Sequence, residues 1–312
     1  MASSPAPRPA GPLKIALAYC TCFILWGSTW AVVKVGLEDL PPLRFVGVRM
    51  LVSGLVLLPF ARSRGATLGV RTTWQLMGVG CLQISIPFAL LFISQQWVAS
   101  SWSALLFSTF PVWLLLVGRV LLPDQGLTGR KLLAAGLGLA GVVALQGDQL
   151  GALETSRQAL LGGLLILTAA VLVAVANVLV KRHMTHVPPH VLVFVQTLSS
   201  AVPLLGLSFL LEAQSPTHWT LRAVLAVAYL ALGGTVLTYQ LLYWLLPRIS
   251  LSALGAMALL DTLVAVVLGV VVLREPLTAS LLIGGSLILS GAALANLLPP
   301  EAAPVSEPPA RG

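Results

Sequence analysis

The chain has 312 residues, of which 57% are hydrophobic and only 9% are charged. A soluble domain carries roughly 25% charged residues, so this chain could not cover its surface in water, and we expect a lipid bilayer around it. Its net charge of +8 comes from basic residues scattered singly or in pairs between apolar segments. That scatter argues against a nucleic-acid partner and is typical of orientation signals in membrane proteins.

Apolar segments of membrane-spanning length follow one another along most of the chain. A helix needs about 20 apolar residues to cross the hydrocarbon core. Residues 1–13, rich in Pro and Ala, and the tail over 299–312, rich in Pro, Ala and Glu, are expected to be disordered. Between them the sequence predicts ten transmembrane helices, at 14–36, 44–61, 73–94, 98–121, 128–147, 159–181, 190–211, 220–245, 250–273 and 278–298.

The first apolar segment is longer than the core of a cleavable signal peptide, so we expect it to remain in the mature protein. Three prolines inside the predicted helices, Pro87, Pro111 and Pro203, are expected to kink them.

The basic residues set the expected orientation. With a cytoplasmic N-terminus, the outside set holds the six residues Lys34, Arg44, Arg49, Arg157, Arg222 and Arg274. The other twelve of the 18 Lys and Arg residues then face the cytoplasm: Arg8, Lys14, Arg62, Arg64, Arg71, Arg119, Arg130, Lys131, Lys181, Arg182, Arg248 and Arg311. The positive-inside rule therefore predicts that both termini are cytoplasmic.

An internal repeat is the most informative feature of the sequence. The stretch LTGRKLLAAGLGLAG at 127–141 resembles LTASLLIGGSLILSG at 277–291, and AVVK ending at Lys34 resembles VLVK ending at Lys181. The similar offsets predict two repeats, 14–147 and 159–298, of five helices each. Because a unit with an odd number of helices ends on the opposite side of the membrane, the second copy is inverted, as in many secondary transporters.

Four stretches also resemble the signatures of EamA-type permeases of the drug/metabolite transporter superfamily. They are Phe23-Ile-Leu-Trp26-Gly27-Ser28-Thr29-Trp30 with Lys34, Arg44-Phe45 with Arg49, Phe110-Pro111, and Arg274-Glu275-Pro276-Leu277-Thr278. The resemblance implies ten helices in two EamA repeats, cytoplasmic termini and export or exchange of small metabolites such as amino acids across the bacterial inner membrane. It also implies that the fifth and tenth helices lie away from the central cavity. The family's acidic residue near the end of the fourth helix is displaced here to Asp124, and Asp261 stands where the repeat would place the equivalent of Pro111.

Ionisable groups inside the predicted helices are candidates for substrate contact. Asp261 lies deep in a predicted helix, where a charge costs at least about 2.5 kcal/mol, so it is expected either to take up a proton or bind an amine, or to be a protonated structural residue. Arg49 could hold a carboxylate bidentately or form a structural salt bridge. Lys34 could contact substrate or act as an interfacial anchor.

Aromatic and amide side chains complete the predicted binding site. Trp30, Trp102 and Tyr239 have small or polar neighbours and are expected to line a cavity. Asn177 lies in the middle of the predicted sixth helix and is expected to face the first helix. Gln83 and the other uncharged polar residues inside helices can bond across helices or contact a substrate, and helix packing is the favoured interpretation for most of them.

The small residues of the fifth and tenth predicted helices allow close helix packing, either between the repeats or in a homodimer. His183, His186 and His190 are interrupted by Pro188 and Pro189, so we expect no metal site, and we expect no cofactor.

The sequence thus predicts a secondary transporter of small metabolites. A multidrug-type efflux permease is the alternative, and a channel or scaffold and an intramembrane enzyme are less favoured. Enzymes of that kind need clustered ionisable groups, whereas here one carboxylate stands alone inside a predicted helix.

Overall fold

A computed structural model describes residues 11–63, 69–98, 103, 106–122, 128–145, 157–273 and 279–297. All regular secondary structure in these ranges is helical. The elements are α1 (Pro12–Leu37), α2 (Pro42–Ser63), α3 (Val70–Gly80), the π-helix η1 (Cys81–Ser85), α4 (Ile86–Ser94), α6 (Phe110–Leu121), α7 (Gly129–Leu145), α8 (Arg157–His183), α9 (Pro189–Leu211), α10 (Leu221–Ala231), the π-helix η3 (Leu232–Leu237), α11 (Thr238–Leu245), α12 (Leu251–Leu273) and α13 (Ala279–Leu297).

The helices have the length and surface of a protein that lies within a membrane. Among the described residues, six stretches are long and apolar enough to cross a bilayer: Pro12–Leu37, Pro42–Ala61, Val70–Ser94, Arg157–His183, Pro189–Leu211 and Leu221–Leu245. Their outward faces carry large apolar side chains such as Leu17, Leu164 and Phe209, the last of which is 72% exposed. Lipid accommodates such faces, whereas a soluble monomer rarely exposes them contiguously. The chain is therefore an all-α integral membrane protein.

Helix bounds lie within a few residues of the predicted segments, with two corrections. Pro12 and Leu13, expected to be disordered, form the first turn of α1, where proline is favoured because its missing N–H is not needed. The fourth predicted helix, 98–121, is not continuous, because a turn at Ser108 and Thr109 precedes α6. The rest of the two expected disordered stretches, 1–10 and 299–312, lies outside the described residues.

One of the three prolines expected to kink helices begins a helix instead, because Pro111 lies in the first turn of α6. Pro87 lies inside the continuous helical stretch Val70–Ser94, directly after the wide π-helical turns of η1. A second π-helix, η3, divides α10 from α11. Pro203 lies inside α9 as predicted. Since π-turns are common at functional sites, we expect η1 and η3 to lie near the functional site of the bundle.

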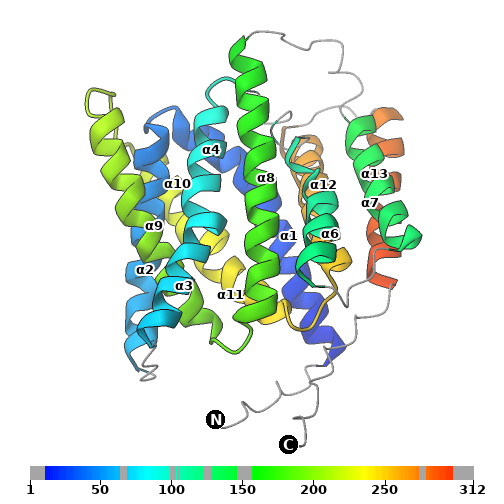
Figure 1. Cartoon of the computed structure of the whole chain (residues 1–312). Helices are drawn as coiled ribbons and strands as arrows, with labels where there is room; N and C mark the ends of the chain where they lie inside the picture. Colours follow the sequence, from blue (N-terminus) through cyan, green and yellow to red (C-terminus); the bar gives the residue numbers. More distant parts are fainter. Residues whose placement is uncertain are drawn as a thin grey trace, which may run out of the picture.

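The helices form paired contacts across the bundle (Figure 1). α2 packs against α9 on one side, α7 packs against α13 on the other, and α1–α12 and α6–α8 contacts lie between these pairs. The α7–α13 pair relies on glycine: a β-carbon on Gly291 would lie 2.7 Å from the Ala134 carbonyl oxygen and 2.8 Å from the Gly138 nitrogen. The small residues of these helices thus serve packing between them, one of the two uses we considered, while the homodimer stays a prediction.

A cluster of charged residues, which we call the α1–α2 clamp, ties the α1–α2 connection to the segment between α9 and α10. Glu212 accepts hydrogen bonds from the backbone nitrogens of Leu43 (2.8 Å) and Arg44 (2.9 Å), so a carboxylate caps the N-terminus of α2. Arg222 contacts Asp39 at 3.0 Å and Glu38 at 2.6 Å. The Arg222 guanidinium, and secondarily the Thr220 hydroxyl, lower the pKa of the Asp39 carboxyl by hydrogen bonding to its charged form.

Candidate functional site

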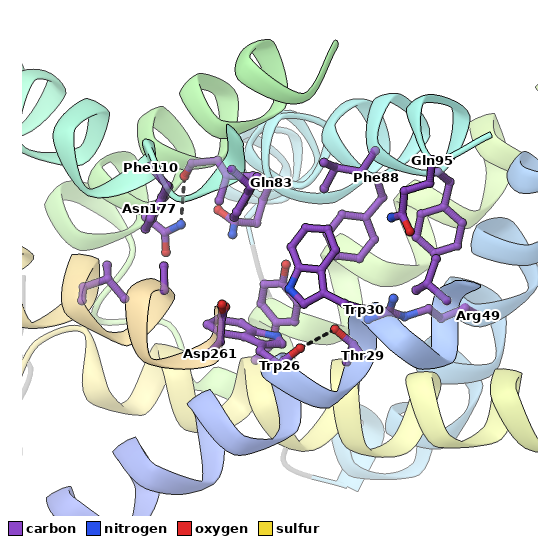
Figure 2. Close-up of a pocket in the computed structure, with 18 residues that line it drawn as sticks. Trp26, Thr29, Trp30, Arg49, Gln83, Phe88, Gln95, Phe110, Asn177 and Asp261 are labelled. Carbon is purple, nitrogen blue, oxygen red and sulfur yellow. Dashed lines mark hydrogen bonds between the residues drawn. The ribbon is translucent and has the colours of Figure 1, made fainter. Parts of the chain in front are cut away.

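A cavity of about 110 Å³ lies in the centre of the bundle, between α1, α2, η1, α4, α6, α8, α11 and α12 (Figure 2). Among the described residues, neither α7 nor α13 contributes a side chain to the lining. The residues that line the cavity are Trp26, Thr29, Trp30, Val33, Arg49, Gln83, Phe88, Leu91, Phe92, Gln95, Phe107, Phe110, Val173, Asn177, Tyr239, Leu254, Ala258 and Asp261. The cavity thus collects side chains from segments far apart in the sequence.

Asp261 on α12 lies at the cavity wall with only 7% of its surface exposed. Its Oδ1 accepts a hydrogen bond from the Thr262 hydroxyl at 3.3 Å, and Thr262 in turn contacts the Ser108 hydroxyl at 3.2 Å. No Lys or Arg within the described ranges forms an ion pair with it. A carboxyl placed in this way can bind a cation or exchange a proton with the cavity.

Gly27 allows α1 to approach α12 at the height of Asp261. A β-carbon at this position would overlap the Asp261 carbonyl oxygen and would lie 2.7 Å from Cβ of Val264. Position 27 therefore requires glycine, because the backbones of α1 and α12 are in contact there. The neighbouring Trp26 and Trp30 then face the cavity beside the carboxyl.

Arg49 on α2 is buried, with 3% of its surface exposed, and is held by neutral partners. Its Nε donates to the Thr235 hydroxyl at 2.9 Å, its Nη2 donates to the Gly234 carbonyl at 3.2 Å, and its guanidinium lies 5.0 Å from the centre of the Phe88 ring. The Gly234 acceptor belongs to η3, so the π-helical turn positions the guanidinium. The sequence predicts that Arg49 either binds a carboxylate substrate or forms a structural salt bridge. None of the described residues supplies a carboxylate to its guanidinium, so Arg49 forms no salt bridge with any of them.

Three amide side chains place unpaired oxygens in the cavity wall. Asn177 donates its Nδ2 to the Val173 carbonyl at 2.8 Å, but its Oδ1 has no hydrogen-bond partner among the described residues. The same holds for the Oε1 atoms of Gln83 and Gln95. A buried acceptor without a donor costs about 1–3 kcal/mol, so these oxygens are available to a bound donor group.

Aromatic rings form most of the remaining wall. Trp26 meets Tyr239 edge to face at 5.7 Å, Trp30 meets Phe107 at 5.9 Å, and Phe107 stacks on Phe110. The cavity therefore suits an amphipathic ligand that has an apolar or flat body and a few charged or polar groups.

Five of the seven predicted site residues line this one cavity: Asp261, Arg49, Trp30, Asn177 and Tyr239. Lys34 lies outside it with an exposed side chain, and its Nζ contacts the carbonyl of the lining residue Gln95 at 3.5 Å. Trp102 lies outside the described residues. Sequence reasoning did not single out Gln95 or Phe88, and it interpreted Gln83 as a packing group, although the π-turn that carries Gln83 faces the cavity.

The helical bundle and its central cavity are typical of a membrane transporter. A family model described as "EamA-like transporter family" matches residues 13–146 and again residues 160–297. The chain belongs to this family and is a membrane transporter. The two matches together span most of the described helices.

Similar proteins agree with this assignment. The chain is 27% identical to the uncharacterized transporter YoaV of Bacillus subtilis, over 89% of this chain and 95% of that protein. It is 29% identical to the uncharacterized inner membrane transporter YedA of Escherichia coli K12, over 79% of each chain. A probable amino-acid metabolite efflux pump of the same strain is 26% identical over 86% of this chain and 90% of that protein. A crystal structure matches the fold with a TM-score of 0.77 and 22% identity, over 92% of this chain and 98% of that one.

Proposed function

We propose that this protein is a secondary transporter that exports or exchanges small metabolites, amino acids or similar amphipathic compounds, across the inner membrane by alternating access. The observation that carries the proposal is the central cavity, which holds both a buried guanidinium and a buried carboxyl. A permanent ion pair would neutralise the two groups, but the described residues supply a counter-charge to neither. The cavity can therefore offer both charges to a substrate.

Ten transmembrane helices in two inverted five-helix repeats form the framework of this proposal. The family model matches two successive stretches, 13–146 and 160–297. The helix contacts follow the symmetry of the two repeats. The first helix of each repeat packs on the fourth helix of the other, as α1 on α12 and α8 on α6, and the two second helices, α2 and α9, pack on each other. The π-turns η1 and η3 occupy equivalent places in the third and eighth predicted helices. Inverted repeats of this kind provide two equivalent packings that open a central site to opposite sides.

Cytoplasmic termini follow from the distribution of basic residues and agree with the arrangement of the bundle. The first residues of α1 and the last residues of α13 lie at the same end of the molecule (Figure 1). The α1–α2 clamp lies at the opposite end, which the orientation places outside the cell. In this arrangement the clamp holds the outer ends of both repeats together.

The test is counterflow into proteoliposomes with labelled amino acids at two imposed pH gradients, comparing wild type with Asp261→Asn. We expect uptake of label to be stimulated by internal substrate. We expect the wild type to respond to the gradient and the mutant to lose that response while still exchanging substrate. The reason is that Asn cannot carry the proton that Asp261 can exchange with the cavity.

Two results would contradict the proposal. Flux that is not saturable and not stimulated from the opposite side would indicate a channel. Turnover of the substrate into a product would indicate an enzyme. Flux that is indifferent to both the gradient and the mutation would leave a facilitator and would remove Asp261 from the coupling mechanism.

A multidrug-type efflux permease is the second candidate, and the aromatic lining favours it. Trp26, Trp30 and Phe107 offer flat apolar faces that do not select for an amino acid. Competition of the labelled counterflow by hydrophobic cations would support this candidate. Competition limited to compounds that carry both charges would favour the metabolite transporter.

A further inference from the structure

The two charged groups of the cavity lie on opposite flanks of α1. The side chains of Trp26, Trp30 and Val33 form the face of α1 that lines the cavity. Gly27 and Thr29 lie at the two edges of this face, because two residues along a helix are about 160° apart around its axis. Residues that pack against Gly27 and residues that pack against Thr29 therefore lie on opposite flanks of α1.

Asp261 packs at the first of these edges and Arg49 at the second. The Asp261 backbone closes on Gly27. On the other edge, a β-carbon on Gly234 would lie 2.9 Å from Cγ2 of Thr29 and 3.3 Å from Nη2 of Arg49, so the guanidinium lies on the Thr29 side. The two flanks of α1 at which these contacts lie are about the diameter of an α-helix, ~10 Å, apart. In Figure 2, Asp261 and Arg49 lie on opposite sides of the Trp30 side chain.

An α-amino acid cannot reach both groups at once. Its ammonium and carboxylate are attached to a single carbon, whereas the Trp30 side chain lies between the two cavity groups in Figure 2. The space between them is lined by Trp26, Trp30 and Tyr239. This middle region favours an apolar or flat body over further charge.

Unpaired amide oxygens are present at both ends of the cavity. In the view of Figure 2, Asn177 lies on the same side as Asp261, and Gln95 lies beside Arg49. The Asn177 Oδ1 lacks a donor among the described residues, and an ammonium brings three N–H donors. A carboxylate suits the Arg49 fork, which uses Nε and Nη2 on Thr235 and Gly234 and keeps further N–H groups.

Resting on the proposed function, we infer that the cavity selects zwitterions whose ammonium and carboxylate are separated by an apolar body, such as ω-amino acids and dipeptides, over α-amino acids. The ammonium binds at Asp261 and Asn177. The carboxylate binds at Arg49. The apolar body lies against Trp30.

The experiment uses purified full-length protein in detergent and measures ligand-induced thermal stabilisation. The ligands are glycine and terminal aminobutanoate, aminohexanoate and aminooctanoate. A matched isomer of the last carries its amine on the carbon next to the carboxylate. We expect affinity to rise along the series and the terminal isomer to bind about tenfold or more tightly than the adjacent isomer, because only the terminal isomer satisfies both charged groups.

Single-charge analogues assign the two ends. In Asp261→Asn, terminal aminooctanoate should bind no better than octanoate, and in Arg49→Gln it should bind no better than octylamine. Arg49→Lys keeps a positive charge and should retain part of the preference. Arg71→Gln, an exposed arginine on α3 away from the cavity, is the matched control and should behave as wild type.

The inference is overturned if the two isomers bind equally, if affinity is independent of chain length, or if no member of the series stabilises the protein. Its failure is distinguishable from that of the proposed function, because binding in detergent needs no transport. Counterflow of α-amino acids without length-dependent binding would keep the transporter and remove the inference. Length-dependent binding without counterflow would keep the inferred binding preference and remove the proposed transport function.

Discussion

Arg49 combines full burial with neutral hydrogen-bond partners, an arrangement that serves ligand binding better than it serves stability. A buried charge keeps a desolvation penalty of several kcal/mol unless a counter-charge compensates it. Thr235, Gly234 and Phe88 compensate only in part, since none of them carries a negative charge.

The substitution Arg49→Met is therefore expected to separate stability from activity. Methionine keeps an unbranched side chain of similar length and removes the charge, so the free energy of unfolding should change by less than about 1 kcal/mol, or rise. Counterflow should fall to background. Thermal melting in detergent beside the transport assay checks both parts, and a variant that melts far below wild type would show that the guanidinium is structural.

Several site residues could be predicted because charge is rare in apolar segments. Asp261 and Arg49 stand out where almost every neighbour is aliphatic, and insertion energetics make such residues suspect. Gln83 and Gln95 could not be separated in this way. An amide inside a helix more often bonds to a neighbouring helix, and Gln95 falls at a helix end where the sequence shows only a break. The ring of Phe88 resembles any other lipid-facing or core side chain until the fold places it beside Arg49.

At the scale of elements, the α1–α2 clamp depends on the ionised form of Asp39. Its pKa is lowered from the ordinary 3.8 because Arg222 and Thr220 donate to the carboxylate. For a carboxyl whose folded pKa is lowered, the stabilisation is present above the ordinary pKa and is lost as the pH falls through the folded value. The clamp should therefore remain closed throughout the neutral and mildly acidic range.

The comparison of wild type with Asp39→Asn tests this expectation. The difference in melting temperature between them should stay constant from about pH 8 to about pH 5 and shrink only below the ordinary carboxyl pKa. Glu38→Gln is the control, because the Glu38 side chain is 55% exposed whereas that of Asp39 is 10% exposed. Exposed ion pairs contribute little, so this control should show a small difference at every pH. A difference that already fades near neutral pH would contradict the assigned direction.

The ends of the helices were predictable where prolines and charges mark them, and less so elsewhere. The bounds of α9 and α12 lie within a residue of the predicted segments, since Pro188 and Pro189 mark the start of one and Arg248 and Ser250 precede the other. The late start of α6 was not predicted, because residues 98–109 are apolar enough to continue a helix. The π-turns η1 and η3 also leave no periodic signal, since one widened turn shifts the pattern by a single residue.

For the whole molecule, orientation is the property to measure. The proposed topology places the segment between α9 and α10 outside the cell and the connection between α8 and α9 inside. Gln214→Cys and His186→Cys are a matched pair, because both positions are exposed and both lie between helices. We expect a membrane-impermeant maleimide added to intact cells to label only Gln214→Cys.

Permeabilised cells provide the reference, in which both variants should be labelled. Cys20, Cys22 and Cys81 are free thiols that lie within helices, and the unsubstituted protein measures their background. Labelling of His186→Cys alone in intact cells would invert the whole topology. Equal labelling of both would contradict the single crossing by α9 that the proposed topology places between them.

The contact at Gly27 also constrains how this gene can vary. Every single-base change that alters the amino acid encoded by a glycine codon adds a β-carbon or ends the chain, and at position 27 a β-carbon meets the backbone of α12. We therefore expect no change of the amino acid at this position to be neutral. Gly11 and Gly78, around which a β-carbon would meet nothing, are free to drift. We therefore expect purifying selection on this one codon to fix the height at which α1 meets Asp261, while the side chains that line the cavity can change around it.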